Sequence, residues 1–380
     1  MQTQTNAKSG SRLFYLDNIR IYLTILVILQ HAAISYGGTG DWAVKDPAVD
    51  ELSPIFLTFF NAVNQSYFMS AFFLLAGYFT PRSFEGKGAG SFLKDRLIRL
   101  GIPIIIYSTL IFNLNQVLIE VWMRKQPFQW ILAYQAGHLW FLLALLLFAV
   151  IYVIYRAVVD RNKTKQYFQY YSDRFPPNRA LILSIVFLIV LTFIVRIRFS
   201  VGEWTYPGFQ LAHSVHYAFS FFVGILAYRG DWLNRLDRDQ ARRWGIVALI
   251  MMPLFFVVAI LGGALEGGAA FERFLGGLHW QSLGYTTWES ILLIAILTFL
   301  LYFFREHVNR TSPLLRSMAA SVYTVYIIHQ TVLFVFNILF LRVDVPTIVK
   351  FPIVSLIAVP LCFGLAVLIR RIPYAKSVLG

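Results

Sequence analysis

The sequence predicts an all-α, polytopic membrane protein with about ten transmembrane helices and both termini in the cytoplasm. Three observations lead to this fold class. Hydrophobic residues make up 58% of the chain and charged residues 14%, whereas soluble domains have roughly 45–50% and ~25%. Apolar stretches of about 20 residues, the length that crosses a ~30 Å hydrocarbon core, recur along the chain. The basic residues lie mostly on alternate connections between these stretches.

The apolar stretches define ten candidate spans. They lie near 14–36, 54–79, 98–120, 138–157, 180–199, 209–228, 244–264, 284–304, 317–340 and 347–369. Because these spans use almost the whole chain, we expect one membrane domain over 13–372. A disordered tail at 1–12 would precede it, and a short C-terminal tail at 373–380 would follow.

The distribution of Lys and Arg predicts the orientation. With the N-terminus in the cytoplasm, 24 of the 33 Lys and Arg residues fall on cytoplasmic segments and 8 on outer segments. Cytoplasmic loops of membrane proteins carry such an excess of positive charge, so both termini are expected inside and the number of helices is expected to be even. This distribution accounts for most of the formal net charge of +14 without a nucleic-acid partner.

The first span carries the most informative polar residues. An ionisable side chain at mid-helix costs roughly 2.5–3.5 kcal/mol to insert, which makes it a candidate functional residue. Arg20 and His31 are eleven residues apart, so they lie within ~20° of one helical face and ~16 Å apart along the axis. Asp17 precedes Arg20 by three residues and can form an ion pair with it. The structural alternative is a snorkelling Arg20 and a hydrogen-bonded core His31.

Two further groups of polar residues stand at or inside the spans. Arg96 and Arg99 share a face at the cytoplasmic start of the third span, and guanidinium groups suit phosphates. The positive-inside rule alone would also place arginines there. Polar side chains also occur in the ninth span and at the start of the fourth, namely Tyr323, Tyr326, His329 and His138.

A metal site is not expected. His213 and His216 have a spacing that can bind metal, but no acidic third ligand is apparent near them. The single cysteine, Cys362, permits no internal disulfide. The sequence contains no phosphate-binding loop, nucleophile elbow or zinc-protease helix.

Four stretches, taken in order, resemble the acyltransferase-3 family of membrane proteins. They are Arg20 followed after ten residues by His31, the segment FFLLAGYF at 72–79, Arg96 and Arg99 before Ile102 and Pro103, and the segment SVYTVYIIH at 321–329. Within the family, the stretches 14–17, 76–79, 99–103 and 138–142 are most similar to a subgroup linked to succinylation of periplasmic glucans. Two positions depart from the expected pattern: Ala76 replaces a common serine, and Gln330 stands where that subgroup can carry a second His.

The resemblance implies a ten-helix acyltransferase in a bacterial inner membrane. Acyl-CoA (acetyl-CoA or succinyl-CoA) would enter from the cytoplasm, and a carbohydrate hydroxyl of the cell envelope would accept the acyl group. Arg96 and Arg99 would bind the donor, assisted by Arg20 and its partner Asp17. His31 would act as the general base, since a pKa near 6.5 suits that role. Acceptor binding or support of His31 would come from the remaining polar group: Tyr323, Tyr326, His329 and His138.

Direct transfer is preferred over an acyl-enzyme because no serine or cysteine is placed as a nucleophile, although an acyl-histidine relay stays open. Two other functions also stay open from the sequence. A secondary transporter or flippase would have a similar number of helices, but the inverted repeats and broken helices common in transporters are not evident. A non-catalytic scaffold would leave the Arg20–His31 pair without a role.

Overall fold

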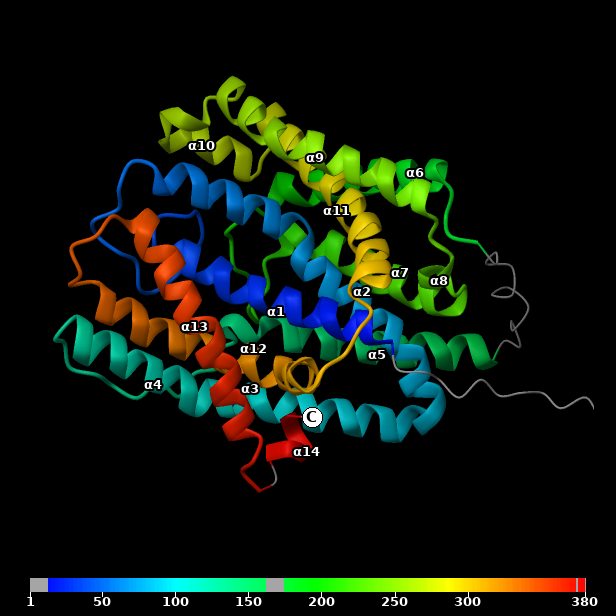
Figure 1. Ribbon diagram of the computed structural model, residues 1–380, viewed down its shortest axis with the longest axis horizontal. Coiled ribbons are helices and arrows are strands. Elements are labelled where there is room, and N and C mark those ends of the chain that lie inside the picture. The colour runs from blue at the N-terminus through cyan, green and yellow to red at the C-terminus, as the bar shows by residue number, and fades with distance from the viewer. Residues whose placement is uncertain (1–12, 162–173, 374, 380) are drawn as a thin grey trace, which may run out of the picture.

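The computed structural model describes residues 13–161, 174–373 and 375–379 and is built from helices (Figure 1). The predicted tail at 1–12 lies outside the described residues, as does much of the predicted loop after the fourth span. In the described part of the chain, β-structure is limited to an isolated bridge between Thr205 and Phe209. The predicted all-α class is confirmed.

Nine helices of the described chain are long and apolar enough to cross a membrane. They are α1 (Phe14–Ser35), the run Ser53–Met123 that begins with α2 (Ser53–Arg96), α5 (Trp140–Arg161), α6 (Asn178–Arg198), α7 (Ser214–Arg229), α9 (Arg238–Leu261), α11 (Trp280–His307), α12 (Pro313–Phe340) and α13 (Thr347–Ile369). The shorter described elements are η4 (Gly137–Leu139), η6 (Leu211–His213), α8 (Trp232–Arg235), η7 (Ala264–Glu266), α10 (Gly268–Leu275) and α14 (Ala375–Leu379).

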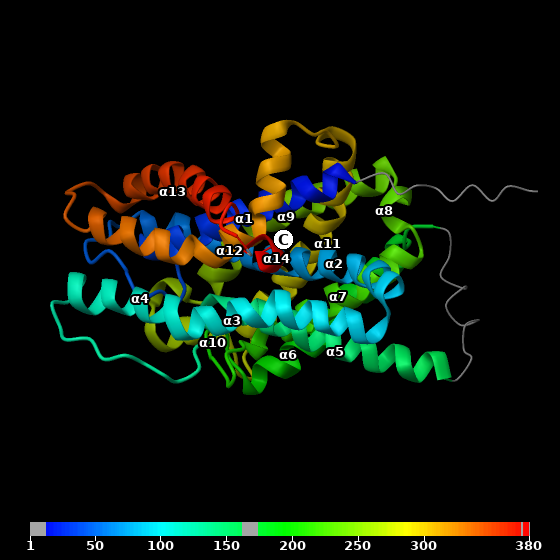
Figure 2. The ribbon, with the colours of Figure 1, turned by 90° about the horizontal axis from the view of Figure 1, so that it is seen from below.

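The second and third predicted spans form one helical run. After α2 the run continues through η1 (Leu97–Gly101), α3 (Ile102–Ile106), η2 (Tyr107–Ile111), α4 (Phe112–Val117) and η3 (Leu118–Met123). The run doubles back within the last part of α2 (Figure 1), and its returning part extends alongside α12 in Figure 2. Gly88 has a φ of 72°, which glycine adopts without the steric penalty of a Cβ. The basic segment expected as a loop is therefore helical, and nine helices accommodate ten predicted spans.

Two helices are enclosed by the others, and this decides where polar side chains can lie. In α1 and α11, 72% of the most apolar window is buried in protein, against 11% in α9. Ionisable residues of α1 and α11 therefore contact protein or cavities, while α9 has the exposure expected of a lipid-facing helix.

A close backbone contact fixes α2 against α7. A Cβ at Gly77 would lie 2.0 Å from the carbonyl oxygen of Phe221, and a Cβ at Gly224 would lie 2.1 Å from that of Leu74. Small residues permit such close approach of helices in membranes. Gly77, which belongs to the family-like segment 72–79, therefore has a packing role.

Candidate active site

Two cavities lie along α1, one towards each end. The first, of about 580 Å³, is lined by Asp17 and Arg20 near the start of the helix. The second, of about 450 Å³, is lined by Val27 and His31 further along. Tyr326 of α12 lines both. We name them the inner and outer cavity after the predicted orientation. One face of α1 thus serves both cavities, as the spacing of Arg20 and His31 predicted.

The inner cavity is rich in arginine. Arg20, Arg96, Arg99 and Arg370 line it together with Asp17. The predicted ion pair forms, with 3.7 Å between Arg20 Nη1 and Asp17 Oδ1, and the Arg20 side chain stays 38% exposed. Four guanidinium groups against one carboxylate on its wall make this cavity suited to an anion.

The arginine pair is held by its own helical run. Arg99 Nε lies 3.1 Å from Asp95 Oδ1, and the Arg96 guanidinium lies 5.1 Å from the centroid of the Phe92 ring. The hydroxyl of Tyr323 donates a hydrogen bond to the backbone oxygen of Arg99. Tyr323 therefore belongs to the inner cavity, whereas His329 does not line it.

The C-terminal end of the chain contributes to the same cavity, which the sequence analysis did not foresee. Arg370 follows α13, and Val378 and Leu379 belong to α14; all three line the inner cavity with Asp17 of α1. The two ends of the described chain therefore lie on one side of the helix bundle. In the sequence, Arg370 is one of the basic residues that predict the orientation. It lies just after an apolar span, and this position gives no sign that its side chain lines a cavity.

In the outer cavity, a chain of hydrogen bonds determines which nitrogen of His31 carries the proton. Nδ1 of His329 lies 2.7 Å from the backbone oxygen of Tyr326, and a carbonyl only accepts, so Nδ1 holds a proton. Nε2 of a neutral His329 is then an acceptor, and His31 Nδ1, at 3.1 Å, donates to it. Nε2 of His31 is left with its lone pair. The ring also stacks on Trp42, with centroids 4.5 Å apart.

His138 is held between α12 and the returning helical run. Its Nε2 donates to the backbone oxygens of Tyr326 and Ile327, at 3.0 and 3.1 Å. Its Nδ1 lies 2.8 Å from Oε1 of Gln330, and the Tyr107 hydroxyl donates a hydrogen bond of 2.6 Å to the same oxygen. Gln330, noted in the sequence as a departure from the subgroup, is thus part of the polar network beside the histidines.

Tyr326 separates the two cavities. Its hydroxyl donates a hydrogen bond to the backbone oxygen of His138, which fixes the ring between α12 and the start of α5. The predicted polar strip of α12 is therefore divided: Tyr323 faces the inner cavity, Tyr326 stands between the cavities, and His329 contacts His31 beside the outer cavity.

A buried charged cluster at the wall of the outer cavity was missed. Arg196 Nη2 lies 2.6 Å from Glu289 Oε2, and both side chains are 0% exposed. His213 Nδ1 lies 3.2 Å from Glu289 Oε1, and His216 Nδ1 lies 4.0 Å from it. The prediction that no acidic residue accompanies the two histidines is wrong, because Glu289 comes from α11, far along the sequence.

This cluster offers three ligand atoms within 4.8 Å of one another, from His213, His216 and Glu289. The Arg196 guanidinium already neutralises the carboxylate, so we assign no metal to it. Glu289 could have been found from the sequence: it lies inside the span predicted at 284–304, where the argument applied to His31 applies equally.

Comparison with known proteins agrees with the four motifs. The profile of a family described as an acyltransferase domain matches residues 13–368. "Glucans biosynthesis protein C" of Escherichia coli (strain K12 / DH10B) is 26% identical over 287 residues, covering 70% of this chain and 70% of the relative. The protein of the same name from Escherichia coli O9:H4 (strain HS) matches to the same extent. No solved structure matches the chain.

Proposed function

Because this chain belongs to the acyltransferase-3 family, and is thereby a multi-pass membrane O-acyltransferase, we propose that it transfers an acetyl or succinyl group from acyl-CoA to a carbohydrate hydroxyl. The donor would enter from the cytoplasm, and the acceptor would be a cell-envelope carbohydrate outside a bacterial inner membrane. The observation that carries this proposal is the pair of unlike cavities served by one face of α1, with arginines at one and His31 at the other.

The inner cavity is the donor site in this proposal. Arg96 and Arg99 bind the phosphates of CoA, because guanidinium groups make bidentate hydrogen bonds to phosphate oxygens. Arg20, oriented by Asp17, guides the pantetheine arm along α1. The ~16 Å from Arg20 to His31 along the helix axis is within reach of that arm once it passes Tyr326.

The reaction is a direct transfer in which His31 is the general base. The lone pair on Nε2 takes the proton of the acceptor hydroxyl, and the oxygen attacks the thioester carbonyl carbon. The carbon–sulfur bond breaks, the acyl group becomes an ester of the sugar, and the CoA thiolate receives the proton back from His31. His329 holds the required tautomer of His31, and His138 supports α12 beside it. General acid–base catalysis of this kind contributes about 10²–10⁴-fold.

A carbohydrate acceptor is supported by the relatives, whose name refers to glucans. The outer cavity also carries amide groups of Gln30, Asn61 and Gln65 among aromatic walls. A site with a few placed polar groups in a mainly apolar lining is typical of small-molecule binding. The family match over 13–368 favours this enzyme over the transporter, flippase and scaffold that the sequence left open.

The proposal is tested by measuring consumption of radiolabelled acetyl-CoA and succinyl-CoA. Detergent-purified wild type, His31→Ala and the matched control His279→Ala, an exposed histidine outside both cavities, are each given an envelope-glycan extract. We expect wild type and His279→Ala to move label from one donor to the glycan, and His31→Ala to move none. If wild type consumes neither donor, the proposal fails and a transporter becomes the better account.

A further inference from the structure

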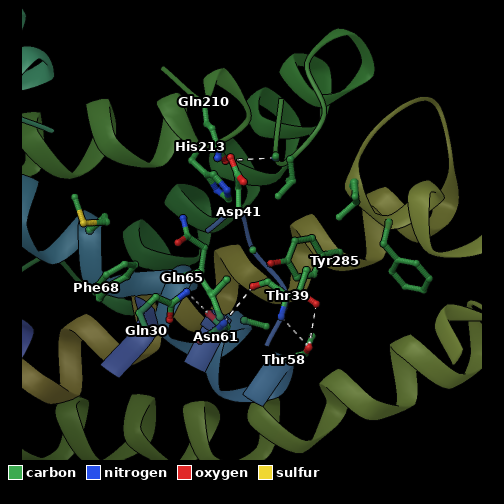
Figure 3. Close-up of a pocket in the computed structure, with 18 of the residues that line it drawn as sticks. Gln30, Thr39, Asp41, Thr58, Asn61, Gln65, Phe68, Gln210, His213 and Tyr285 are labelled. Atoms are coloured by element: carbon green, nitrogen blue, oxygen red, sulfur yellow. Dashed lines mark hydrogen bonds between the residues drawn. The ribbon is translucent and has the colours of Figure 1, made fainter. Parts of the chain in front are cut away.

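The outer cavity has a second polar end besides the one at His31. His213 of η6, Asp41 of the first outer connection and Gln210 line this end. In the view of Figure 3 they are grouped together, above Gln30 and Asn61 on the other side of the cavity. We name Asp41, Gln210 and His213 the distal end. The chemistry proposed above does not use it.

Of the distal end, His213 is held in place by the buried Arg196–Glu289 pair. Arg196 donates to Glu289, to Thr286 Oγ1 at 3.0 Å and to the backbone oxygen of Ala212 at 3.2 Å. Its guanidinium also lies 5.3 Å from the centroid of the Tyr285 ring. Removing a charged pair from water is costly, and ionisable residues at membrane depth mark functional sites by default. The most direct use of this pair is to position its two neighbours that line the cavity, His213 and Tyr285.

Nδ1 of His213 faces the buried ion pair. It lies 3.2 Å from Arg196 Nη2 and 3.2 Å from Glu289 Oε1, so these two buried groups hold the imidazole ring in place. Nε2 is the ring nitrogen left for a ligand, and it donates or accepts a hydrogen bond according to the tautomer.

The complementary ligand follows from these groups. A sugar hydroxyl both donates and accepts, so it can pair with His213 Nε2 in either tautomer and can donate to the Asp41 carboxylate, which only accepts. Trp140 and Tyr217, which stack with centroids 5.4 Å apart, also line the cavity and add apolar surface to it. An anionic sugar at the same place would be repelled by Asp41.

We propose that the distal end is an acceptor subsite that binds hydroxyl groups of an uncharged sugar residue, adjoining the residue acylated at His31, and that Asp41 selects against acidic glycans. This inference rests on the proposed function, because it assigns the part of the acceptor that does not react. It predicts that the distal end affects acceptor affinity and choice while leaving the donor and the chemical step unchanged.

The test measures steady-state transfer to a neutral glucose oligosaccharide and to a glucuronate-containing oligosaccharide of equal length. We expect Asp41→Asn to lower the preference for the neutral acceptor about tenfold. His213→Phe should raise the acceptor KM about tenfold, the loss of roughly one hydrogen bond, with donor KM and kcat within twofold of wild type. His213→Gln, whose amide both donates and accepts hydrogen bonds, should recover most of the affinity. Asp344→Asn, an exposed carboxylate outside the cavity, is the control.

The outcomes separate this inference from the function on which it rests. If wild type acylates a sugar while Asp41→Asn and His213→Phe keep its acceptor KM and charge preference, the subsite is overturned and the proposed function stands. If wild type acylates neither oligosaccharide, both fall together. Because Asp41 is exposed at the cavity, its variant gives a result even if the change at His213 destabilises the buried pair.

Discussion

The inner and outer cavities sit along the same helix yet are built from different chemistry. The inner cavity is lined by permanently charged guanidinium groups, and Arg20 and Arg99 stay 38% and 47% exposed. The outer cavity is lined by imidazoles, amides and aromatic rings. Arginine cannot be deprotonated in proteins, so it stays near water or, like Arg196, needs a buried counter-charge. Histidine can be buried as a neutral ring whose tautomer its neighbours choose.

In the proposed function, this contrast lets one bundle hold a polyanion and a neutral hydroxyl at once. Charge would attract the donor to the inner cavity, and directed hydrogen bonds would hold the acceptor in the outer cavity. Tyr326, which lines both cavities, keeps the two environments apart. Changes on one side should therefore alter donor kinetics, and changes on the other should alter acceptor kinetics or chemistry.

The largest effect is expected when the tautomer of His31 is no longer fixed. His329→Phe removes the acceptor at 3.1 Å from His31 Nδ1, so His31 is no longer held as a base at Nε2. We expect kcat for acyl transfer to fall by roughly 10²-fold, with donor KM little changed. His329→Gln places an amide oxygen near the same position and should retain more activity than His329→Phe. Equal loss in both variants would argue against a role in fixing the tautomer.

Next in size is the effect of removing charge at the inner cavity. The double variant Arg96→Gln/Arg99→Gln should raise the acyl-CoA KM about 10–100-fold, because bonds between charged groups contribute about 1.5–3 kcal/mol. Acceptor KM should not change. Added salt should raise the donor KM of wild type more than that of the variant. Arg82→Gln, an exposed arginine outside the cavity, is the control. An equal rise of the acyl-CoA KM in this variant would show that general surface charge, and not the inner cavity, causes the effect.

A smaller effect is expected at the boundary. Tyr326→Ala joins the two cavities, so water gains access to the thioester, and hydrolysis of acyl-CoA should rise several-fold relative to transfer. Tyr326→Phe keeps the ring and loses only the hydrogen bond to His138, so its ratio of hydrolysis to transfer should stay near that of wild type. An unchanged ratio in Tyr326→Ala would show that the ring does not separate the two environments.

The smallest effect concerns the stability of the connection between α1 and α2. Asp50 accepts hydrogen bonds from the backbone N–H of Ile348 and the hydroxyl of Thr347, at 2.8 and 2.7 Å, which tie the first outer connection to α13. Burial alone would raise the pKa of Asp50, but the hydrogen bonds from Ile348, Thr347 and Ser53 outweigh it and hold the pKa below its usual value.

With a lowered folded-state pKa, the stabilisation by Asp50 is fully present above the unfolded pKa of ~3.9 and is lost as the pH falls below it. Asp50→Asn should cost about 1–2 kcal/mol near neutral pH, seen as a lower melting temperature in detergent with kcat unchanged. The difference from wild type should shrink below about pH 4. Glu51→Gln, an exposed neighbour, should have the melting temperature of wild type. If Asp50→Asn still melts lower than wild type below pH 4, the ionised Asp50 carboxylate is not the stabilising group.

The sequence predicted the extent of α1 and the face that its polar residues share, because both depend only on local spacing. The spacing of Arg20 and His31 fixed one face of a helix, and Asp17 is in ion-pair range of Arg20 as expected. The apolar spans were also located correctly, since length and hydropathy determine them. The reversal at Gly88 falls between two predicted spans as expected, but the helical conformation of this segment was missed because a basic, glycine-containing segment is equally typical of a loop.

Contacts between distant helices could not be predicted in the same way. His31 and His329 are 298 residues apart, and Arg196 and Glu289 are 93 residues apart. Hydropathy says that these residues are costly in a membrane, but the partners depend on how the helices pack. The same holds for Arg370, whose approach to the inner cavity follows from the position of α13 beside α12 and α1.

The most direct test of the account is whether donor and acceptor must be on opposite sides of the membrane. Protein is reconstituted in sealed liposomes, with radiolabelled acyl-CoA trapped inside and the oligosaccharide acceptor outside, or with both outside. Protein whose cytoplasmic face points inward should make acylated sugar when the two are separated, and protein in either orientation should make none when they share one side, until detergent opens the membrane. Equal product in sealed liposomes with both substrates outside would contradict the assignment of the two cavities.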